Sequence, residues 1–197
     1  MLLNQEELNA THVMVDLETL STAPDALIVS IGAYKFSFKE DSAQKSTFYL
    51  PIDVTKVYPN RYTVDVRTVQ WWMRQSKEAQ VVFNDANSVT LPSALTQLAD
   101  WINSFGSEVR IWGNGANFDN VILRNAYTQE GIKAPWKYAH DRCFRSLTAL
   151  LPSVPLERKG THHNALDDAI YQAEYLIEAV KASSDKIFSP AKSSSTS

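Results

Sequence analysis

The stretch HVMVDLETLSTAPDALIVSIGAYKF, at residues 12–36, contains two apolar runs typical of neighbouring β-strands, and the first run carries two acids. Side chains two residues apart in a strand point to the same face, so Asp16 and Glu18 project together. Their Cα atoms would lie roughly 7 Å apart, a span that two carboxylates can close around a divalent cation. The alternative is that the strand ends at Leu17 and that both acids are solvated.

The composition is that of an ordinary folded domain. The 197 residues are 44% hydrophobic and 21% charged, with a net charge of −3, which does not indicate a strongly basic nucleic-acid binder. We expect no membrane span, because the chain lacks an apolar run of about 18 residues, and no secretory signal at the N-terminus. A single cysteine, Cys143, excludes an internal disulfide and a cysteine-based zinc site, and it favours a cytoplasmic location.

The hydrophobic pattern predicts an α/β domain with a mixed sheet, because three strands are followed by alternating helices and strands. We expect strands at 12–17, 27–38, 46–52, 108–115 and 136–140, and helices at 66–83, 92–104, 117–131, 142–151 and 165–182. We therefore predict an N-terminal extension at 1–11, a domain at 12–182 and a disordered Ser-rich tail at 183–197.

A third acid follows a later predicted strand. In EVRIWGNGANFDN (108–120), Asp119 lies in the first turn of a predicted helix, with Asn117 as its N-cap. The helix dipole alone would favour a carboxylate there. A functional role is the alternative, because open α/β sheets place their sites at the carboxyl ends of the strands.

The last predicted helix begins within THHNALDDAIYQAEYLIEAV (161–180). Asn164 is the expected N-cap, with Asp167 in a capping-box position, so that His163 lies on the preceding loop and Asp168 about one turn into the helix. His163 and Asp168 can then face one site. Neither Asp167 nor Asp168 falls on the predicted core stripe of Leu166, Ile170, Ala173, Ile177 and Val180.

Three motifs in this order resemble the DEDDh 3′–5′ exonucleases of the DnaQ-like, RNase H-like superfamily. They are VDLET (15–19), NGANFDN (114–120) and HNALDDA (163–169). The His-x-Ala-x-x-Asp pattern of the third motif selects His163 and Asp168 over His162 and Asp167. With WGNGANFDN (112–120) and TVQWWMRQS (68–76), the chain is most similar to the exodeoxyribonuclease VIII-like and phage exonuclease A (DexA)-like enzymes.

The resemblance implies a fold, a metal site and a base. The fold would be an RNase H-like, five-stranded mixed sheet, with three antiparallel strands, then parallel additions, and helices on both faces. Asp16, Glu18, Asp119 and Asp168 would hold two divalent ions, Mg²⁺ or Mn²⁺, and His163 would be the general base. The enzyme would release nucleoside 5′-monophosphates from the 3′ ends of single-stranded DNA. The alternatives are an exoribonuclease and a catalytically silent module that binds nucleic acid.

The resemblance also suggests which residues meet the substrate. The expected contacts are Leu17, Thr19, Leu20, Asn117, Phe118, Trp72, Arg142 and Arg145. Further residues that could stack on bases or neutralise phosphates are Trp71, Arg74, Arg158 and Lys159, and we expect one residue of the adjacent Trp pair to be buried. No membrane partner is expected, and a homodimer is possible by analogy.

Overall fold

The structure is a computed structural model that describes residues 3–39, 45–57, 60–115 and 117–188, with the side chains of 184–188 excepted. One sheet has the strand order β3-β2-β1-β4-β5. The strands are β1 (His12–Thr19), β2 (Ile28–Phe36), β3 (Ser46–Pro51), β4 (Arg110–Gly113) and β5 (Asp141–Cys143). The first three are antiparallel neighbours, and β4 and β5 are added in parallel. The predicted mixed sheet is therefore confirmed.

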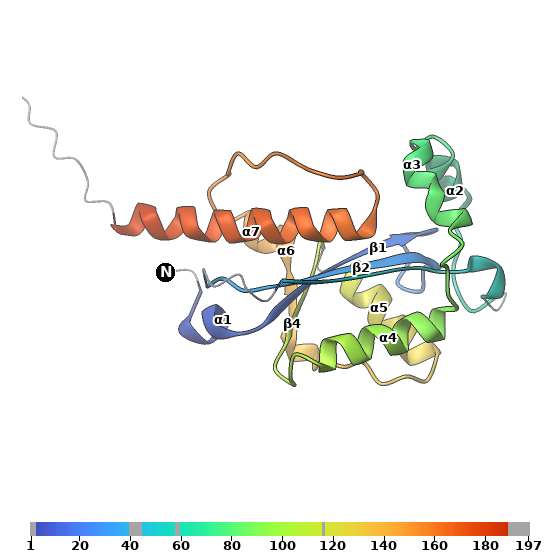
Figure 1. Ribbon diagram of the computed structural model, residues 1–197, viewed down its shortest axis with the longest axis horizontal. Helices are drawn as coiled ribbons and strands as arrows, with labels where there is room; N and C mark the ends of the chain where they lie inside the picture. Colours follow the sequence, from blue (N-terminus) through green and yellow to red (C-terminus); the bar gives the residue numbers. More distant parts are fainter. Residues whose placement is uncertain (1–2, 40–44, 58–59, 116, 189–197) are drawn as a thin grey trace, which may run out of the picture.

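Helices cover both faces of this sheet. They are α1 (Gln5–Asn9), α2 (Val66–Trp72), α3 (Lys77–Gln80), α4 (Leu91–Asn103), α5 (Asp119–Gln129), α6 (Phe144–Thr148) and α7 (Ala165–Phe188). Figure 1 shows α7 along one face and α4 and α5 on the other, while α2 and α3 project beyond the end of β1. No helix within the described ranges is long and apolar enough to cross a bilayer.

The two faces of β1 pack against different helices. Val13, Val15 and Leu17 belong to the core shared with α4 and α5, whereas Met14 packs with Trp112 and α7. Asp16 and Glu18 follow Met14 on the α7 face, paired with Gly32 and Ser30 of β2. Because β1 continues through Thr19, the alternative in which the strand ends at Leu17 is wrong. The two acids lie on the strand, under α7.

The face of α7 that meets the sheet differs from the predicted stripe. Ile170, Ile177 and Val180 are only partly buried and flank the contact. The fully buried row comprises Ala165, Asp168, Ala169, Gln172, Ala173, Leu176 and Ala179. The helix axis approaches the sheet closely, which requires small residues at the contact and puts large ones at its edges. This rotation places Asp168 on the buried face and leaves Asp167 off it.

Gly32 of β2 makes this close approach possible. A Cβ atom built on Gly32 would lie 2.1 Å from the backbone carbon of Ala165 and 2.3 Å from the nitrogen of Leu166. Backbone atoms at the first turn of a helix cannot rotate away as a side chain can. Any larger residue must therefore push α7, and Asp168 with it, away from β1.

We predict that Gly32→Ala lowers the free energy of unfolding by about 1–3 kcal/mol, the usual range for overpacking. The nuclease activity that the resemblance leads us to expect should fall by more, roughly a hundredfold, since a displacement of about 1 Å at a catalytic group has that effect. Urea unfolding and steady-state kinetics would measure the two effects. Gly115→Ala is the stability control, because its Cβ would come no closer than 3.5 Å to another group.

Several predicted boundaries differ from those in the structure. The helix predicted at 66–83 is broken, because the Ser76 side chain accepts a hydrogen bond from the Ala79 N–H and begins a new helix, α3. The strand predicted at 136–140 is displaced to β5, after a 3-10 turn at 138–140. In the predicted tail, residues 183–188 continue α7, and 189–197 lie outside the described residues.

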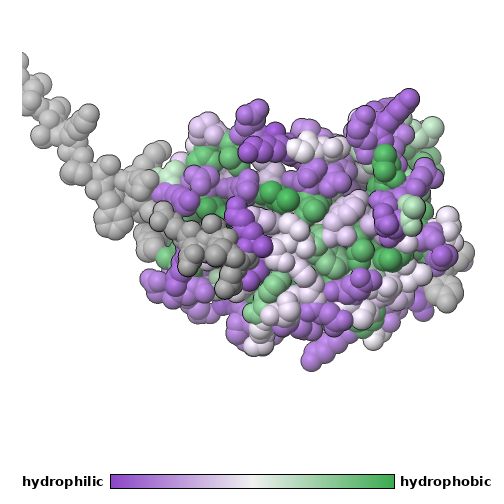
Figure 2. All heavy atoms as spheres, in the orientation of Figure 1, coloured by the Kyte–Doolittle hydropathy of each residue, from purple (hydrophilic) through white to green (hydrophobic). Residues whose placement is uncertain are grey.

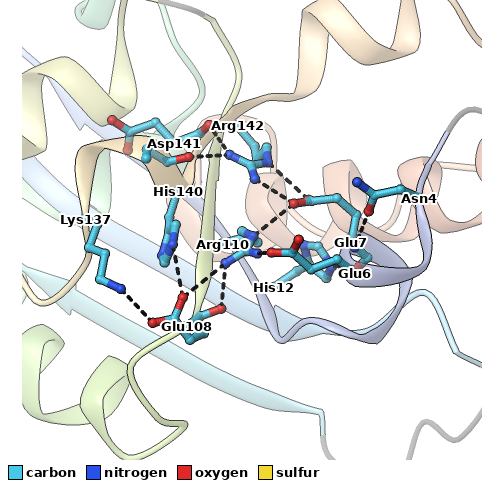
Figure 3. A network of polar contacts seen from close by, with 11 residues as sticks. Asn4, Glu6, Glu7, His12, Glu108, Arg110, Lys137, His140, Asp141 and Arg142 are labelled. Carbon is cyan, nitrogen blue, oxygen red and sulfur yellow. Dashed lines mark hydrogen bonds and ion pairs between the residues drawn. The ribbon is translucent and has the colours of Figure 1, made fainter.

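The N-terminal extension is not featureless, because it forms α1 and is held by a network of charged groups (Figure 3). Arg110, of which only 4% of the side chain is exposed, pairs with Glu6 and Glu7. Arg142 donates to both carboxylate oxygens of Glu7, at 3.1 and 2.6 Å. Burial raises the pKa of Glu7, but hydrogen bonds and charges from Arg142 and Arg110 outweigh it and lower the pKa to about 2. These contacts bind residues 3–11 to the part of the sheet formed by β4 and β5.

His12 completes this attachment as a neutral imidazole. Its Nδ1 accepts a hydrogen bond from Trp112 Nε1 at 2.9 Å, which places the proton on Nε2, and Nε2 donates to the Glu7 carbonyl at 2.8 Å. Burial lowers the pKa of His12 to about 4. The folded state therefore resists protonation of this ring.

We predict that His12 makes the fold sensitive to acid. Between pH 6.5 and 4 the unfolded state binds the proton and the folded state does not, so stability falls as the pH falls through this window. Asp16 and Glu18 have raised pKa values, so their protonation makes the folded state more stable as the pH falls. The contribution of His12 is therefore measured by comparison with His12→Gln, whose side chain keeps one hydrogen-bond donor and one acceptor. The free energy of unfolding of the wild type, minus that of the variant, should fall by about 3 kcal/mol from pH 6.5 to 4. A difference independent of pH would contradict it.

Candidate active site

The end of β1 opens into a cleft of about 770 Å³ between the sheet, α7 and the segment that carries α2. Asp16 and Glu18 both line this cleft, as do His163 and Asp168. Asp16 Oδ1 accepts a hydrogen bond from Gln172 Nε2 at 2.7 Å, and Gln172 lies one helical turn after Asp168. The first and third sequence motifs therefore meet across the β1–α7 contact.

Asp119 approaches the same site from the opposite side of the sheet. Its side chain is buried, and it accepts hydrogen bonds from the Leu17 N–H at 3.1 Å and the Asn114 N–H at 2.8 Å. Gly113 is required beside it, since a Cβ there would lie 2.5 Å from Asn120 Oδ1 and 2.9 Å from Asp119 Cβ. The second motif thus ties the β4–α5 turn to the backbone of the first motif.

The helix boundary at this motif differs from the prediction. Helix α5 begins at Asp119, Phe118 occupies the N-cap position, and no side chain caps the helix there. The predicted role of Asn117 as N-cap is therefore wrong. Asn117 is exposed and is not among the residues that line the cleft, and its contact with substrate stays a prediction. Phe118 does line the cleft, as predicted.

His163 lies on the loop before α7 in a left-handed backbone conformation, with φ of 63°. Few residues other than glycine adopt this conformation, and it is often found at functional sites. Asn164 Oδ1 accepts hydrogen bonds from the N–H groups of Leu166 and Asp167, which confirms the predicted N-cap. The capping box is absent, because Asp167 accepts a hydrogen bond from the Thr161 N–H instead.

Three side chains of the motifs converge closely enough to share one cation. Ligand atoms of Glu18, His163 and Asp168 all lie within 4.8 Å of one another. Carboxylate oxygens suit Mg²⁺ or Mn²⁺, so Glu18 and Asp168 fit such an ion, with the His163 ring beside them. Asp168 Oδ1 is buried and makes no hydrogen bond within the described part of the chain, although the Arg158 guanidinium lies against it as an ion pair.

The electrostatics of the cleft also favour a cation. Burial, followed by the charges of Asp119 and Glu18, raises the pKa of Asp16 well above its ordinary value. Burial and the charge of Asp119 raise the pKa of Glu18 to about 8. Burial raises the pKa of Asp119 to about 6 although three backbone N–H groups, those of Asn114, Leu17 and Asp119 itself, oppose the shift. Carboxylates that resist ionisation together are stabilised by a divalent ion, so these residues fit a metal site.

The comparisons with known proteins agree with this geometry. A family model described as the 3′–5′ exoribonuclease Rv2179c-like domain matches residues 11–180. The chain belongs to this family. It is a 3′–5′ exonuclease. The particular closeness to the DexA-like enzymes that the sequence suggested finds no support in these comparisons.

The nuclease domain of 3′hExo has a similar fold. The chain is similar to the nuclease domain of 3′hExo, a DEDDh family member determined bound to rAMP. The two share 12% identity and a TM-score of 0.59, over 91% of this chain and 94% of that one. The RNase domain of the yeast Pop2 protein matches at 14% identity and a TM-score of 0.38, over 58% of this chain and 47% of that one. No curated protein matches the chain.

The residues predicted to contact substrate divide into two groups in this exonuclease. Leu17 and Thr19 line the cleft, and Leu20 does not. Arg142 is bound to Glu7 in the network that holds α1, so its predicted substrate contact is wrong. Arg145 is exposed, and its charge lowers the pKa of Asp119, which places it near the cleft.

The tandem tryptophans behave as one buried and one exposed residue. Trp72 is 3% exposed and its Nε1 donates to the Thr19 carbonyl at 2.9 Å, so Trp72 supports the end of β1. Its predicted stacking on substrate is therefore wrong. Trp71 is 40% exposed, lines the cleft and packs edge-on against His163 at 4.7 Å between ring centroids. Trp71 is the tryptophan available to a ligand.

Sequence reasoning missed several residues of the cleft. Gln172 was detectable in principle, because it lies four residues after Asp168 and thus on the same face of the helix. Arg67 and Thr68 line the cleft with Trp71 because α2 runs along its rim. Their position depends on where α2 packs, and no local pattern in the sequence carries that information.

Proposed function

We propose that this exonuclease removes single nucleotides from the 3′ ends of single-stranded RNA, with divalent ions held by Asp16, Glu18, Asp119 and Asp168. The observation that carries the proposal is the convergence of Glu18, His163 and Asp168 within 4.8 Å at the end of β1. These residues come from two motifs about 145 positions apart (163 − 18), and a structural role alone would not require their contact. The presence of all four acids and the histidine argues against a silent module.

In the proposed reaction, bound divalent ions supply positive charge for the phosphate and for the attacking water. His163 takes a proton from that water through a ring nitrogen. The water oxygen forms a bond to phosphorus as the bond from phosphorus to the 3′ oxygen breaks. The products are a nucleoside 5′-monophosphate and a chain one nucleotide shorter with a 3′-hydroxyl. Gln172 holds Asp16 in place, and backbone N–H groups of Leu17 and Asn114 hold Asp119.

The description of the family as exoribonucleases supports RNA as the substrate. The preference for DNA drawn from the sequence rests only on the resemblance to phage enzymes. The two sugars differ at the 2′-hydroxyl, which a protein recognises by a hydrogen bond. Backbone and hydroxyl groups at Thr19, Ser21 and Thr22 line the cleft and offer such partners.

The test is digestion of single-stranded 15-mers, labelled at the 5′ end, in the presence of Mg²⁺ or Mn²⁺. One oligonucleotide is RNA and the other is DNA of the same sequence. We expect a ladder of shortened RNA and slower loss of DNA, with no cleavage in EDTA. Faster digestion of DNA would overturn the choice of RNA and leave the exonuclease intact. Homodimerisation and a cytoplasmic location stay predictions, and size-exclusion chromatography with light scattering checks the first.

Several apolar side chains on or just after α2 and α3 are exposed: Val66 is 70% exposed, Met73 74% and Val81 60%. In Figure 2 small green areas lie among purple ones in the region where Figure 1 places these helices. Arg67 and Trp71 lie one turn apart on α2, and both line the cleft. A cationic and an aromatic side chain on one helix face suit a single strand, which is held by phosphate neutralisation and base stacking.

We predict that Trp71→Ala raises the KM for a 15-mer by about tenfold, since the loss of one stacked base costs roughly 1–3 kcal/mol. Met73→Ala is the matched control, because Met73 follows the same helix and is 74% exposed but does not line the cleft. Steady-state rates at several oligonucleotide concentrations give both constants. Equal KM values for the two variants would exclude stacking on Trp71.

A further inference from the structure

The loop between α6 and α7 sends one charged side chain into the active site. This loop, residues 149–164, arches over α7 in Figure 1. Arg158 lines the cleft, forms an ion pair with Asp168, and lies over the ring of Tyr171 at 5.0 Å from guanidinium carbon to ring centroid. Its side chain is 25% exposed. A long exposed loop thus places a guanidinium on one of the proposed metal ligands.

The base of the loop is attached to α7 just after Arg158. The Thr161 N–H donates to Asp167 Oδ2 at 2.8 Å. Gly160 has a left-handed φ of 82°, and a Cβ there would lie 2.4 Å from Asp167 Cγ. Only glycine satisfies both conditions. Asp167 takes no part in the proposed chemistry. Its contacts with Gly160 and Thr161 fix the end of the loop next to Arg158, and so fix the position of Arg158 relative to Asp168.

The charge of Arg158 also acts on two other acids of the cleft. Its charge opposes the rise in the pKa of both Asp16 and Glu18. A cluster of buried carboxylates is costly without positive charge. The guanidinium and a divalent ion on Asp168 would occupy the same side of one carboxylate, so Asp168 cannot bind both through Oδ1. Arg158 must give up this contact when the site takes up metal.

We propose that Arg158 is an exchangeable counter-ion: it pairs with Asp168 in the metal-free protein and turns to the phosphate of the substrate in the metal-loaded enzyme. The proposal rests on the proposed metal ligands. A guanidinium suits both partners, because its planar fork binds carboxylate and phosphate with two parallel hydrogen bonds. The contact with Tyr171 keeps the group at the cleft wall during the exchange.

Binding of Mn²⁺ alone, by calorimetry or EPR, tests the first half. Arg158→Gln should bind Mn²⁺ about threefold to tenfold more tightly than the wild type, because Asp168 no longer has to leave a charge-assisted partner. The metal-free variant should also melt at a lower temperature. Lys159→Gln is the matched control, since Lys159 is the exposed neighbour on the same loop. Unchanged or weaker Mn²⁺ binding by Arg158→Gln would overturn the exchange.

Binding of adenosine 5′-monophosphate in saturating Mn²⁺ tests the second half. Arg158→Gln should weaken this affinity about tenfold, the usual value of one charge-assisted contact, and Arg158→Lys should restore part of it. Equal affinities would overturn the phosphate contact. If wild type and Asp168→Asn bind Mn²⁺ equally, the proposed metal site itself is wrong. If only the exchange at Arg158 is wrong, the wild type and Arg158→Gln bind Mn²⁺ with equal affinity, while Asp168→Asn still binds it more weakly. Should Arg158→Gln not fold, Arg158→Lys gives the same comparisons with smaller effects.

Discussion

Asp168→Asn is expected to lower kcat by at least roughly a thousandfold, while the neighbouring Asp167→Asn retains most of its activity. The two residues are adjacent carboxylates at the start of α7, yet they face different partners. Asp168 is 8% exposed, on the buried row of the helix and in the cluster with Glu18 and His163. Asp167 only accepts a hydrogen bond from the Thr161 N–H, which an asparagine oxygen can also accept.

The measurement is the single-turnover rate on a labelled RNA 15-mer in saturating Mn²⁺, with thermal melting of both variants as a check on folding. Loss of one ligand leaves the remaining carboxylates to bind the ions, so some activity at high metal concentration is compatible with the proposal. Asp16→Asn should match or exceed the effect of Asp168→Asn, because Asp16 is buried and the charges of both Asp119 and Glu18 act on it. Equal rates for Asp167→Asn and Asp168→Asn would refute the assignment of the metal ligands.

His163→Asn is expected to lower kcat by roughly a hundredfold to ten-thousandfold, the range for loss of a general base. Asparagine is the informative substitution, because His163 has a φ of 63° and asparagine tolerates this left-handed conformation better than alanine does. The backbone before α7 should then stay in place. His162→Asn is the control, since His162 is exposed and stands outside the three-residue cluster.

The pH profile distinguishes a base from a residue that only supports the loop. Burial, with the charges of His162 and Arg158, lowers the pKa of His163 below its ordinary value of 6.5. A base acts in its neutral form, so in saturating metal kcat should fall only as the pH drops below about 6.5. His163→Asn should lose this acidic limb along with its rate. If the variant still shows the same fall of kcat at acid pH as the wild type, a group other than His163 is responsible for that fall.

Local pattern was sufficient for elements whose signal lies in a few consecutive residues. The alternation around Asp16 predicted β1, and Asn164 predicted the start of α7, because both depend on spacing and on one capping side chain. The same reasoning failed where packing decides. The predicted apolar stripe of α7 is rotated away from the real contact, since close approach at Gly32 selects alanines over larger residues. Side-chain periodicity does not contain the distance between a helix and a sheet.

By itself, the sequence determined four of the five strands, the exonuclease family and the positions of the three motifs, because each resides in a short pattern of residue types. The tertiary structure alone decided which neighbouring residues share the site. It buried Trp72 and left Trp71 at the cleft, bound Arg142 to Glu7, and brought Gln172 and Arg158 to the acids. These contacts join segments far apart in the chain, so they follow from how the helices and the long loop pack on the sheet.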